Sequence, residues 1–336
     1  MKLSVEFILG KDEGIMRGLA MLKKRIKDKL DSVLKTIVWY NKPLIRKCIR
    51  HPVVIFKMDG GTCSQLNNYV SMKMLEERTG TNMIMDLGWY DRYGKGEGGK
   101  IGNDSVLARP YNIDKLFDLK EYQAAGKVQA WLYKVLFAYF PPRDMVKREL
   151  GVDLSTFKLP SAPCYLHGYF KYRLSEIEKN IDKYCTLKSK EEILDDENME
   201  IYQEIFACAN PIGVHVRRGD MAVEGGYWKV LPEQYFINVC EDLKGPDSMF
   251  FFFSEEPQWV LEHIIPFVDI RYRVVNNSAF YGYRDLYLLS QCRYVVRSQG
   301  SFGEYAYMIN KREDRKLIAY NKDNLRLWEW RSEYEA

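Results

Sequence analysis

The sequence predicts an α/β protein made of two units, each containing a parallel sheet. Short apolar runs of strand length alternate with helix-like segments, which is the pattern of a doubly wound sheet. The alternation occurs twice, and a densely charged stretch near residues 188–205 lies between the two series. At 336 residues with 46% hydrophobic side chains, the chain is large enough to bury a core in both units.

These patterns divide the chain into four parts. We expect a basic helical extension over residues 1–50, a first α/β unit over 51–195, a second over 196–325 and a tail over 326–336. The extension holds thirteen Lys and Arg against five Asp and Glu, although the formal net charge of the whole chain is only +4. The basic character therefore belongs to the extension, and the rest of the chain is acidic.

Within the extension, apolar residues recur at spacings of three and four from Ile15 to Tyr40, and most lysines fall elsewhere. This spacing predicts an amphipathic helix. Its apolar face has two interpretations. It packs on the body of the protein or on another copy, or residues 14–40 rest on an anionic membrane surface as a peripheral contact.

In the first unit, the apolar and β-branched run over residues 53–58 predicts a buried strand. Gly60 and Gly61 end this run, and residues 65–77 have helical spacing. Paired glycines between a strand and a helix let backbone N–H groups approach an anion or a sugar, although the same pair also suits an ordinary turn. A second strand is predicted to end at Asp86, before an exposed Gly-rich loop.

The second unit opens with the strand "IGVHV", which is followed by "RRGDM". Alternation along the strand places His215 and Arg217 on one face and Arg218 on the other. One arginine can then face a cleft while its neighbour braces the turn. Guanidinium groups suit a diphosphate because they donate paired, charge-assisted hydrogen bonds to phosphate oxygens. A surface ion pair between Arg218 and Asp220 is the alternative.

Further polar residues follow the next two predicted strands. Ser254 and Glu255 end "MFFFFS", and Ser298, Gly300 and Ser301 precede the helix-like "GEYAYMI". A Ser-Gln-Gly-Ser turn at a helix N-terminus is a candidate phosphate seat, and plain capping by the last serine is the alternative. Ligands of open α/β sheets gather beyond the carboxyl ends of the strands, which is where these clusters fall.

Spacing also argues against several classes of protein. None of the four histidines lies at a zinc-ligand spacing, and the seven cysteines form no C-x-x-C pair. No apolar run approaches the ~18 residues that a membrane span needs, and the first residues lack the order of a signal peptide. We therefore expect a cytosolic protein with reduced thiols, without a metal and without a nucleic-acid partner.

Several motifs, in order, resemble those of one enzyme family. "HVRRGD", "FFFFSEEPQWV" and "DLYLLSQC" with "SQGSF" are similar to the three motifs of the α-1,2-fucosyltransferases, and "VVIFKMDGGTCSQLNNY" is similar to their N-terminal Gly-Gly/Gln signature. "MDLGWYD", "RPYNIDKLF" and "LHGYFKYRLSEI" match between them. "LLSQCRYVV" also resembles the α-1,6- and protein O-fucosyltransferases. The resemblance spans roughly residues 53–310.

The resemblance implies a GT-B architecture, with two Rossmann-like domains facing a cleft, and metal-independent, inverting transfer from GDP-β-L-fucose. The C-terminal domain would hold the donor and the N-terminal domain would contact the acceptor. Arg217 would grip the β-phosphate. The other residues implied in donor binding are His215, Arg218, Ser254, Glu255, Asp285, Ser298, Gly300, Ser301 and Phe302, and the Gly-Gly signature comprises Gly60, Gly61 and Gln65.

We therefore expect a fucosyltransferase that acts on a glycan or lipid-linked acceptor, at O-2 of a galactose-like residue, in bacterial surface polysaccharide synthesis at the inner face of the plasma membrane. Asp220 is favoured as the base, with Glu224 and Asp59 as alternatives. "GSFGEY" and "TCSQ" depart from the family pattern, so another GDP-6-deoxyhexose donor or another linkage stays open. A non-enzymatic adhesion protein that uses Arg218-Gly219-Asp220 is the alternative from a different class.

Overall fold

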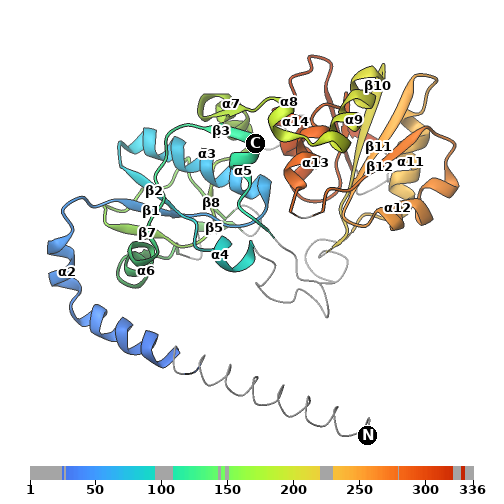
Figure 1. The fold of residues 1–336 in the computed structure, drawn as a ribbon. Coiled ribbons are helices and arrows are strands. Elements are labelled where there is room, and N and C mark those ends of the chain that lie inside the picture. The colour runs from blue at the N-terminus through green and yellow to red at the C-terminus, as the bar shows by residue number, and fades with distance from the viewer. Residues whose placement is uncertain are drawn as a thin grey trace, which may run out of the picture.

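The architecture is α/β, with two largely parallel sheets and the helices that cover them (Figure 1). The computed structural model describes residues 25, 28–94, 109–142, 145–147, 151–219, 230–278, 280–320 and 327–329. The predicted fold class is confirmed by the parallel pairing within both large sheets. The division near residue 195 stays a prediction.

The N-terminal sheet has four parallel strands in the order β2-β1-β7-β4. Its strands are β1 (Val54–Lys57), β2 (Met83–Asp86), β4 (Ala138–Tyr139) and β7 (Cys164–Leu166). Alternation along β1 sends Phe56 towards α3 (Thr62–Thr79) and Ile55 towards α6 (Lys127–Leu136). Both faces are covered, which is why β1 is apolar over most of its length.

The C-terminal sheet has the order β12-β11-β10-β13-β14-β15, and all of its pairs are parallel except β14 with β15. Its strands are β10 (Asn210–Val216), β11 (Ser248–Ser254), β12 (Tyr272–Val275), β13 (Tyr294–Val296), β14 (Lys316–Tyr320) and β15 (Leu327–Glu329). In β11, Phe250 and Phe252 join one core while Phe251 and Phe253 join another. The run of four phenylalanines thus belongs to a central strand that is buried on both faces.

Four helices pack around this second sheet, and they begin or end near its carboxyl edge. They are α11 (Glu233–Leu243), α12 (Pro257–His263), α13 (Gly282–Leu289) and α14 (Phe302–Ile309), with the 3-10 turn η2 (Ile265–Phe267) after α12. α9 (Asp196–Ala207) leads directly into β10. The predicted alternation of strands and helices is therefore observed in this half.

The remaining elements are short. They are α2 (Lys42–Cys48), α4 (Tyr90–Tyr93), α5 (Ile113–Leu116), α7 (Leu174–Tyr184), α8 (Lys190–Ile193), the pair β3 (Phe117–Leu119) and β9 (Cys185–Leu187), and a sheet of β5 (Val146–Lys147), β6 (Gly151–Asp153) and β8 (Phe170–Lys171). Residues 28–40 are also helical. No helix in the described ranges is long and apolar enough to cross a bilayer.

One continuous hydrophobic core joins the two halves. It includes Phe56 and residues of α3 on one side, and Phe251, Phe253 and residues of α13 and α14 on the other. The Asn67 side chain of α3 donates a hydrogen bond to the Tyr305 hydroxyl of α14 at 2.6 Å, and both groups are buried. The N-terminal parts of α3 and α14 are thereby held close to each other.

Candidate active site

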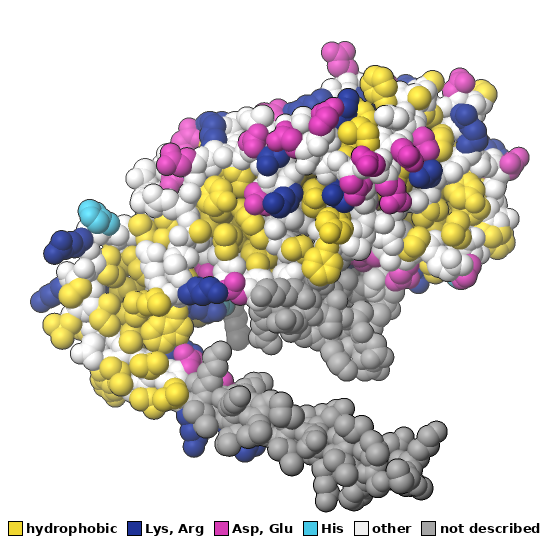
Figure 2. All heavy atoms as spheres, viewed as in Figure 1, with side chains coloured by type: hydrophobic (Ala, Val, Ile, Leu, Met, Phe, Trp, Pro, Cys, Tyr) yellow, Lys and Arg dark blue, Asp and Glu magenta, His cyan; other side chains and the backbone are white. Residues whose placement is uncertain are grey.

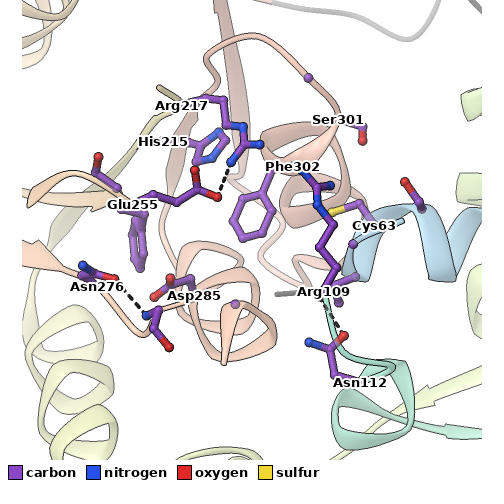
Figure 3. A pocket seen from close by; sticks show the side chains of 18 of the residues that line it. Cys63, Arg109, Asn112, His215, Arg217, Glu255, Asn276, Asp285, Ser301 and Phe302 are labelled. Atoms are coloured by element: carbon purple, nitrogen blue, oxygen red, sulfur yellow. Dashed lines mark hydrogen bonds and ion pairs between the residues drawn. The ribbon is translucent and has the colours of Figure 1, made fainter. Parts of the chain in front are cut away.

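A pocket opens between the two halves, at the carboxyl ends of β10 and β11 (Figure 3). Residues from both halves line it, and they are Gly61, Thr62, Cys63, Ser64, Arg109, Pro110, Asn112, His215, Arg217, Phe253, Ser254, Glu255, Asn276, Ser278, Gly282, Asp285, Gln299, Gly300, Ser301 and Phe302. Its position agrees with the rule that α/β sheets bind ligands beyond the carboxyl ends of their strands.

Three helices present their N-termini to this pocket. α3 begins after Gly61, α13 begins at Gly282 and α14 begins after Ser301, and none of the three has a side-chain cap. Uncapped N–H groups and the positive ends of the helix dipoles favour an anion. The expected alternative role of Ser301 as a hydrogen-bonding cap is not observed.

Arg217 brings a fixed positive charge to the pocket. Its backbone N–H, just beyond β10, donates to the Ser298 hydroxyl at 3.0 Å. Its guanidinium pairs with Glu255, which follows β11, and Figure 3 shows the two side chains directed towards each other. A diphosphate that enters the pocket would compete with Glu255 for this guanidinium, because both are anions that accept its N–H groups.

Arg218 points elsewhere, as alternation at the strand end predicts. Its guanidinium pairs with Glu256 at 3.1 Å and lies 4.1 Å from the centre of the Trp259 ring. Glu256 also accepts the backbone N–H of Gly219 at 2.8 Å. Arg218 is thus not among the pocket-lining residues and instead braces the turn after β10. The arginine that an adhesion tripeptide would have to expose is bound to the protein itself.

His215 lies beneath Arg217 as a neutral ring. Burial, and then the charges of Arg217 and Arg297, lower its pKa to about 3. Its Nδ1 is 3.0 Å from the Ser298 hydroxyl, and its ring stacks on Phe302 with centroids 4.7 Å apart. Because Ser298 already accepts the Arg217 N–H, its own proton is free for Nδ1, which leaves the His215 proton on Nε2.

Asp285 lines the pocket from the first turn of α13. Burial raises its pKa to about 7, against the opposing effect of hydrogen bonds from Asn277. The Asn277 side chain donates to Asp285 at 2.7 Å and exchanges two further hydrogen bonds with Asn198 of α9, at 2.7 and 2.8 Å. This amide pair, of which Asn198 is buried, fixes the orientation of the carboxyl group.

Gly61 lines the pocket from the N-terminal half, and Gly60 and Gln65 support it from behind. Gly60 has φ +80°, and a Cβ there would lie 2.6 Å from the Ser64 side chain, so this turn requires glycine. The Gln65 amide donates to the carbonyls of Gly60 and Pro110, and its oxygen accepts the N–H groups of Asn112 and Ile113 at 2.9 and 3.1 Å. Gln65 is fully buried, and it ties the first turn of α3 to residues 109–113.

Comparison with known proteins assigns the family. Residues 143–335, more than half of the chain, match the model named glycosyl transferase family 11. The chain belongs to this family. Its membership confirms the enzyme class and the fucosyltransferase family that the motifs predict.

This family 11 chain is similar to individual proteins as well. It is 26% identical to the O-antigen biosynthesis glycosyltransferase WbnK of Escherichia coli. The 133 aligned residues cover 37% of this chain and 43% of that relative. The chain thus matches less than half the length of that relative. Its fold is similar to NodZ α-1,6-fucosyltransferase soaked with GDP-fucose (17% identity, TM-score 0.49, 84% and 99% of the two chains). It is also similar to fucosyltransferase NodZ from Bradyrhizobium (17%, TM-score 0.48, 84% and 99%).

The structure of the family 11 protein adds residues that the sequence had not marked out as site residues. Arg109 is the most important of them, because it brings a second cation to the pocket from the N-terminal half. Figure 3 shows its side chain extending past Cys63 towards Phe302. The only sequence signal was its place in "RPYNIDKLF", where no residue stood out by type. The others are Thr62, Cys63, Ser64, Pro110, Asn112, Phe253, Asn276, Ser278, Gly282 and Gln299.

Most predicted donor residues of the family 11 protein meet at the pocket. Those that line it are His215, Arg217, Ser254, Glu255, Asp285, Gly300, Ser301 and Phe302, together with Gly61. Those that stand behind the lining are Gly60, Gln65, Arg218 and Ser298. Asp59, an alternative base, is buried and ion-paired with Lys57 at 2.6 Å. Asp220 and Glu224 lie outside the described residues.

Within the described ranges, no group of three or more His, Cys, Asp and Glu side chains is arranged to hold a metal ion. The charged groups that are directed into the pocket of the family 11 protein are instead Arg109, Arg217, Glu255 and Asp285. The pocket can therefore bind an anion through arginine and backbone N–H groups of its own.

Proposed function

We propose that the protein transfers L-fucose from GDP-β-L-fucose, with inversion, to a hydroxyl group of a glycan, at O-2 of a galactose-like residue. The observation that carries this proposal is the convergence of two arginines and three helix N-termini on one pocket. That arrangement suits the diphosphate of a nucleotide sugar. Membership of family 11 supports the transfer reaction.

In the proposed mechanism, Arg217 leaves Glu255 and binds the β-phosphate. The acceptor hydroxyl attacks the anomeric carbon from the face opposite GDP, and the bond to the phosphate oxygen breaks as the new glycosidic bond forms. GDP leaves with the bonding electron pair, and its added negative charge is stabilised by the guanidinium and the helix N-termini. A carboxylate accepts the hydroxyl proton, and we assign this role to Asp220, with Glu224 as the alternative.

We assign Asp285 to the guanine base. An ionised carboxylate can accept the two neighbouring N–H groups of guanine, whereas a protonated one loses part of this capacity. His215 and Phe302 would then lie between the base and the diphosphate, since both line the pocket next to Arg217. Ser301 and Gly300, at the N-terminus of α14, would contact the diphosphate.

The pH dependence of GDP binding tests the role of Asp285. Its pKa is about 7 in the free protein, so the carboxylate is lost as the pH falls through 7. We expect GDP affinity to weaken from pH 8 to pH 6 by up to about tenfold per pH unit below the pKa. Titration calorimetry on the wild type and on Asp285→Asn measures this, and the variant controls for titration of the GDP phosphate. If GDP affinity depends on pH in Asp285→Asn as strongly as in the wild type, the assignment of Asp285 to the guanine base is contradicted.

Arg109 is proposed as the second diphosphate contact, from the acceptor side. Arg109→Gln should weaken GDP binding by about 10- to 100-fold, the range for a lost charge-assisted hydrogen bond. Guanosine binding should be unchanged, and calorimetry with both ligands separates the two effects. Arg312→Gln, which removes a half-exposed arginine paired with Asp314, is the matched control. Equal losses for guanosine and GDP would show that Arg109 holds the fold rather than the phosphates.

The reaction itself is tested by a donor screen. Purified protein is incubated with GDP-fucose, GDP-mannose and other GDP-6-deoxyhexoses in the presence of simple galactosides, and release of GDP and product is followed. Nuclear magnetic resonance of the product gives the anomeric configuration and the linkage. If another GDP-6-deoxyhexose is the substrate, the proposed donor is wrong, and if the product is α-1,6-linked, the proposed linkage is wrong. If no GDP sugar is turned over, the proposed function is contradicted.

The biological setting is proposed as surface polysaccharide synthesis. The partial similarity to an O-antigen biosynthesis glycosyltransferase supports it. The acceptor would then be an oligosaccharide or a lipid-linked glycan at the cytoplasmic face of the membrane. The two-domain division near residue 195 belongs to the same proposal, with the acceptor held by the first unit and the donor by the second.

A further inference from the structure

The extension before β1 has two sides, one that contacts the body of the protein and one that is exposed. One side is held by the body: the Trp131 indole of α6 donates to Asp31 at 3.1 Å, and Val38 and Ile45 pack against the core cluster that contains Tyr133. These residues are not those of the predicted apolar face, so the structure does not show the predicted packing of that face on the body.

The other side carries large apolar side chains that no part of the described chain covers. Figure 1 shows the helical extension standing away from both sheets, and Figure 2 shows apolar side chains gathered over it. Each of these side chains is more than half exposed, and they are Leu30 (59%), Val33 (56%), Leu34 (52%), Ile37 (54%), Trp39 (56%), Tyr40 (80%) and Leu44 (62%). An apolar patch of this extent marks a surface that binds something.

The charge around this patch identifies the kind of partner. Residues 32–50 contain five basic residues and no acidic one. They are Lys35, Lys42, Arg46, Lys47 and Arg50. A second copy would bring the same positive charges against them, which disfavours self-association through this face. An anionic lipid surface complements them, because it attracts each Lys and Arg near it.

The side-chain types agree with a bilayer interface. Trp39 and Tyr40 are adjacent and exposed at the end of residues 28–40, and such aromatic side chains favour the headgroup level. The Lys42 ammonium lies 4.9 Å from the centre of the Trp39 ring. Long basic side chains reach the phosphates while their stems stay beside apolar groups.

We propose that residues 28–50 lie in the headgroup region of an anionic lipid bilayer. The apolar side chains from Leu30 to Leu44 insert among the acyl chains, and the basic side chains contact the lipid phosphates. The extension then attaches the protein parallel to the membrane surface through a helix that does not span it. This inference concerns attachment and stands independently of the donor and acceptor assigned to the pocket.

Vesicle co-sedimentation of the full chain tests the proposal. Vesicles of phosphatidylcholine alone are compared with vesicles that also contain phosphatidylglycerol, and we expect binding to the second kind, weakened by salt. Arg46→Gln/Lys47→Gln/Arg50→Gln should lower the partition coefficient by about fivefold per charge, on the order of a hundredfold in total. Leu30→Ser/Leu34→Ser/Ile37→Ser should abolish binding.

Matched controls keep the result interpretable. Phe206→Ser/Phe267→Ser removes two side chains that are 77% and 63% exposed on the C-terminal half, and it should bind vesicles like the wild type. All variants should keep the wild-type circular dichroism spectrum and turnover of a water-soluble acceptor, so loss of binding is not loss of fold. Absent binding by the wild type, or equal binding to both kinds of vesicle, would overturn the proposal. A second overturning result combines two observations. The wild type forms a dimer in sedimentation analysis that the triple Ser variant does not form, and the wild type does not bind vesicles.

Discussion

Replacement of Arg217 by alanine is expected to lower kcat by on the order of 10²–10³-fold. The guanidinium is proposed to meet the charge that develops on the departing diphosphate, and the structure places it at the pocket beside the N-terminus of α14. Water that fills the space would be a poorer donor, because it must reorient as the charge forms. Steady-state rates with GDP-fucose and a galactoside measure the loss. Arg217→Lys should recover only part of it, because an ammonium group lacks the paired donors of guanidinium.

Arg218→Ala is the matched comparison, one residue along the chain. This side chain contacts Glu256 and Trp259 instead of the pocket, so its loss should lower the melting temperature more than it lowers kcat per folded molecule. The two variants should therefore separate chemistry from support of the turn. Arg217→Ala with turnover within a few-fold of the wild type would contradict the role given to Arg217.

Replacement of Asp220 by asparagine is expected to lower kcat by about 10²–10⁴-fold, the usual range for loss of a general base. Elimination supports this choice. Of the carboxylates that line the described part of the pocket, Asp285 is held by Asn277, and Glu255, which Arg217 would release on binding the phosphate, follows β11 on the proposed donor side. Asp59 is paired with Lys57 and does not line the pocket. The pH profile of kcat should also lose its acid limb in Asp220→Asn.

Glu224→Gln and Asp59→Asn complete this test. If Glu224 is the base, its variant shows the large loss and the altered pH profile, and the assignment passes from Asp220 to it. Asp59→Asn should cost stability, because the Lys57 ammonium would lose its buried partner, and it should leave the pH profile of kcat unchanged. A change in the pH profile of that variant alone would contradict the elimination.

The directions of the side chains at the strand ends could be predicted from the sequence, because they depend only on the alternation of a few neighbouring residues. The opposite directions of Arg217 and Arg218 follow from the strand period, and the four phenylalanines of β11 follow from burial on both faces. Arg109 and the bracing role of Gln65 could not be read this way. Both depend on residues 109–113 lying against the first turn of α3, 45 positions or more from the glycine pair, and no local pattern encodes that contact.

Glu255, which lines the pocket, also has a proposed role in the release of the product GDP. In the proposed cycle, the departure of GDP removes an anion from Arg217, in a recess that also contains Phe253 and Phe302. The carboxylate that flanks it can return at once, so product release becomes an exchange of one counterion for another. On the proposed function, the guanidinium therefore changes partners within the pocket wall, because the carboxylate that replaces the phosphate is already there.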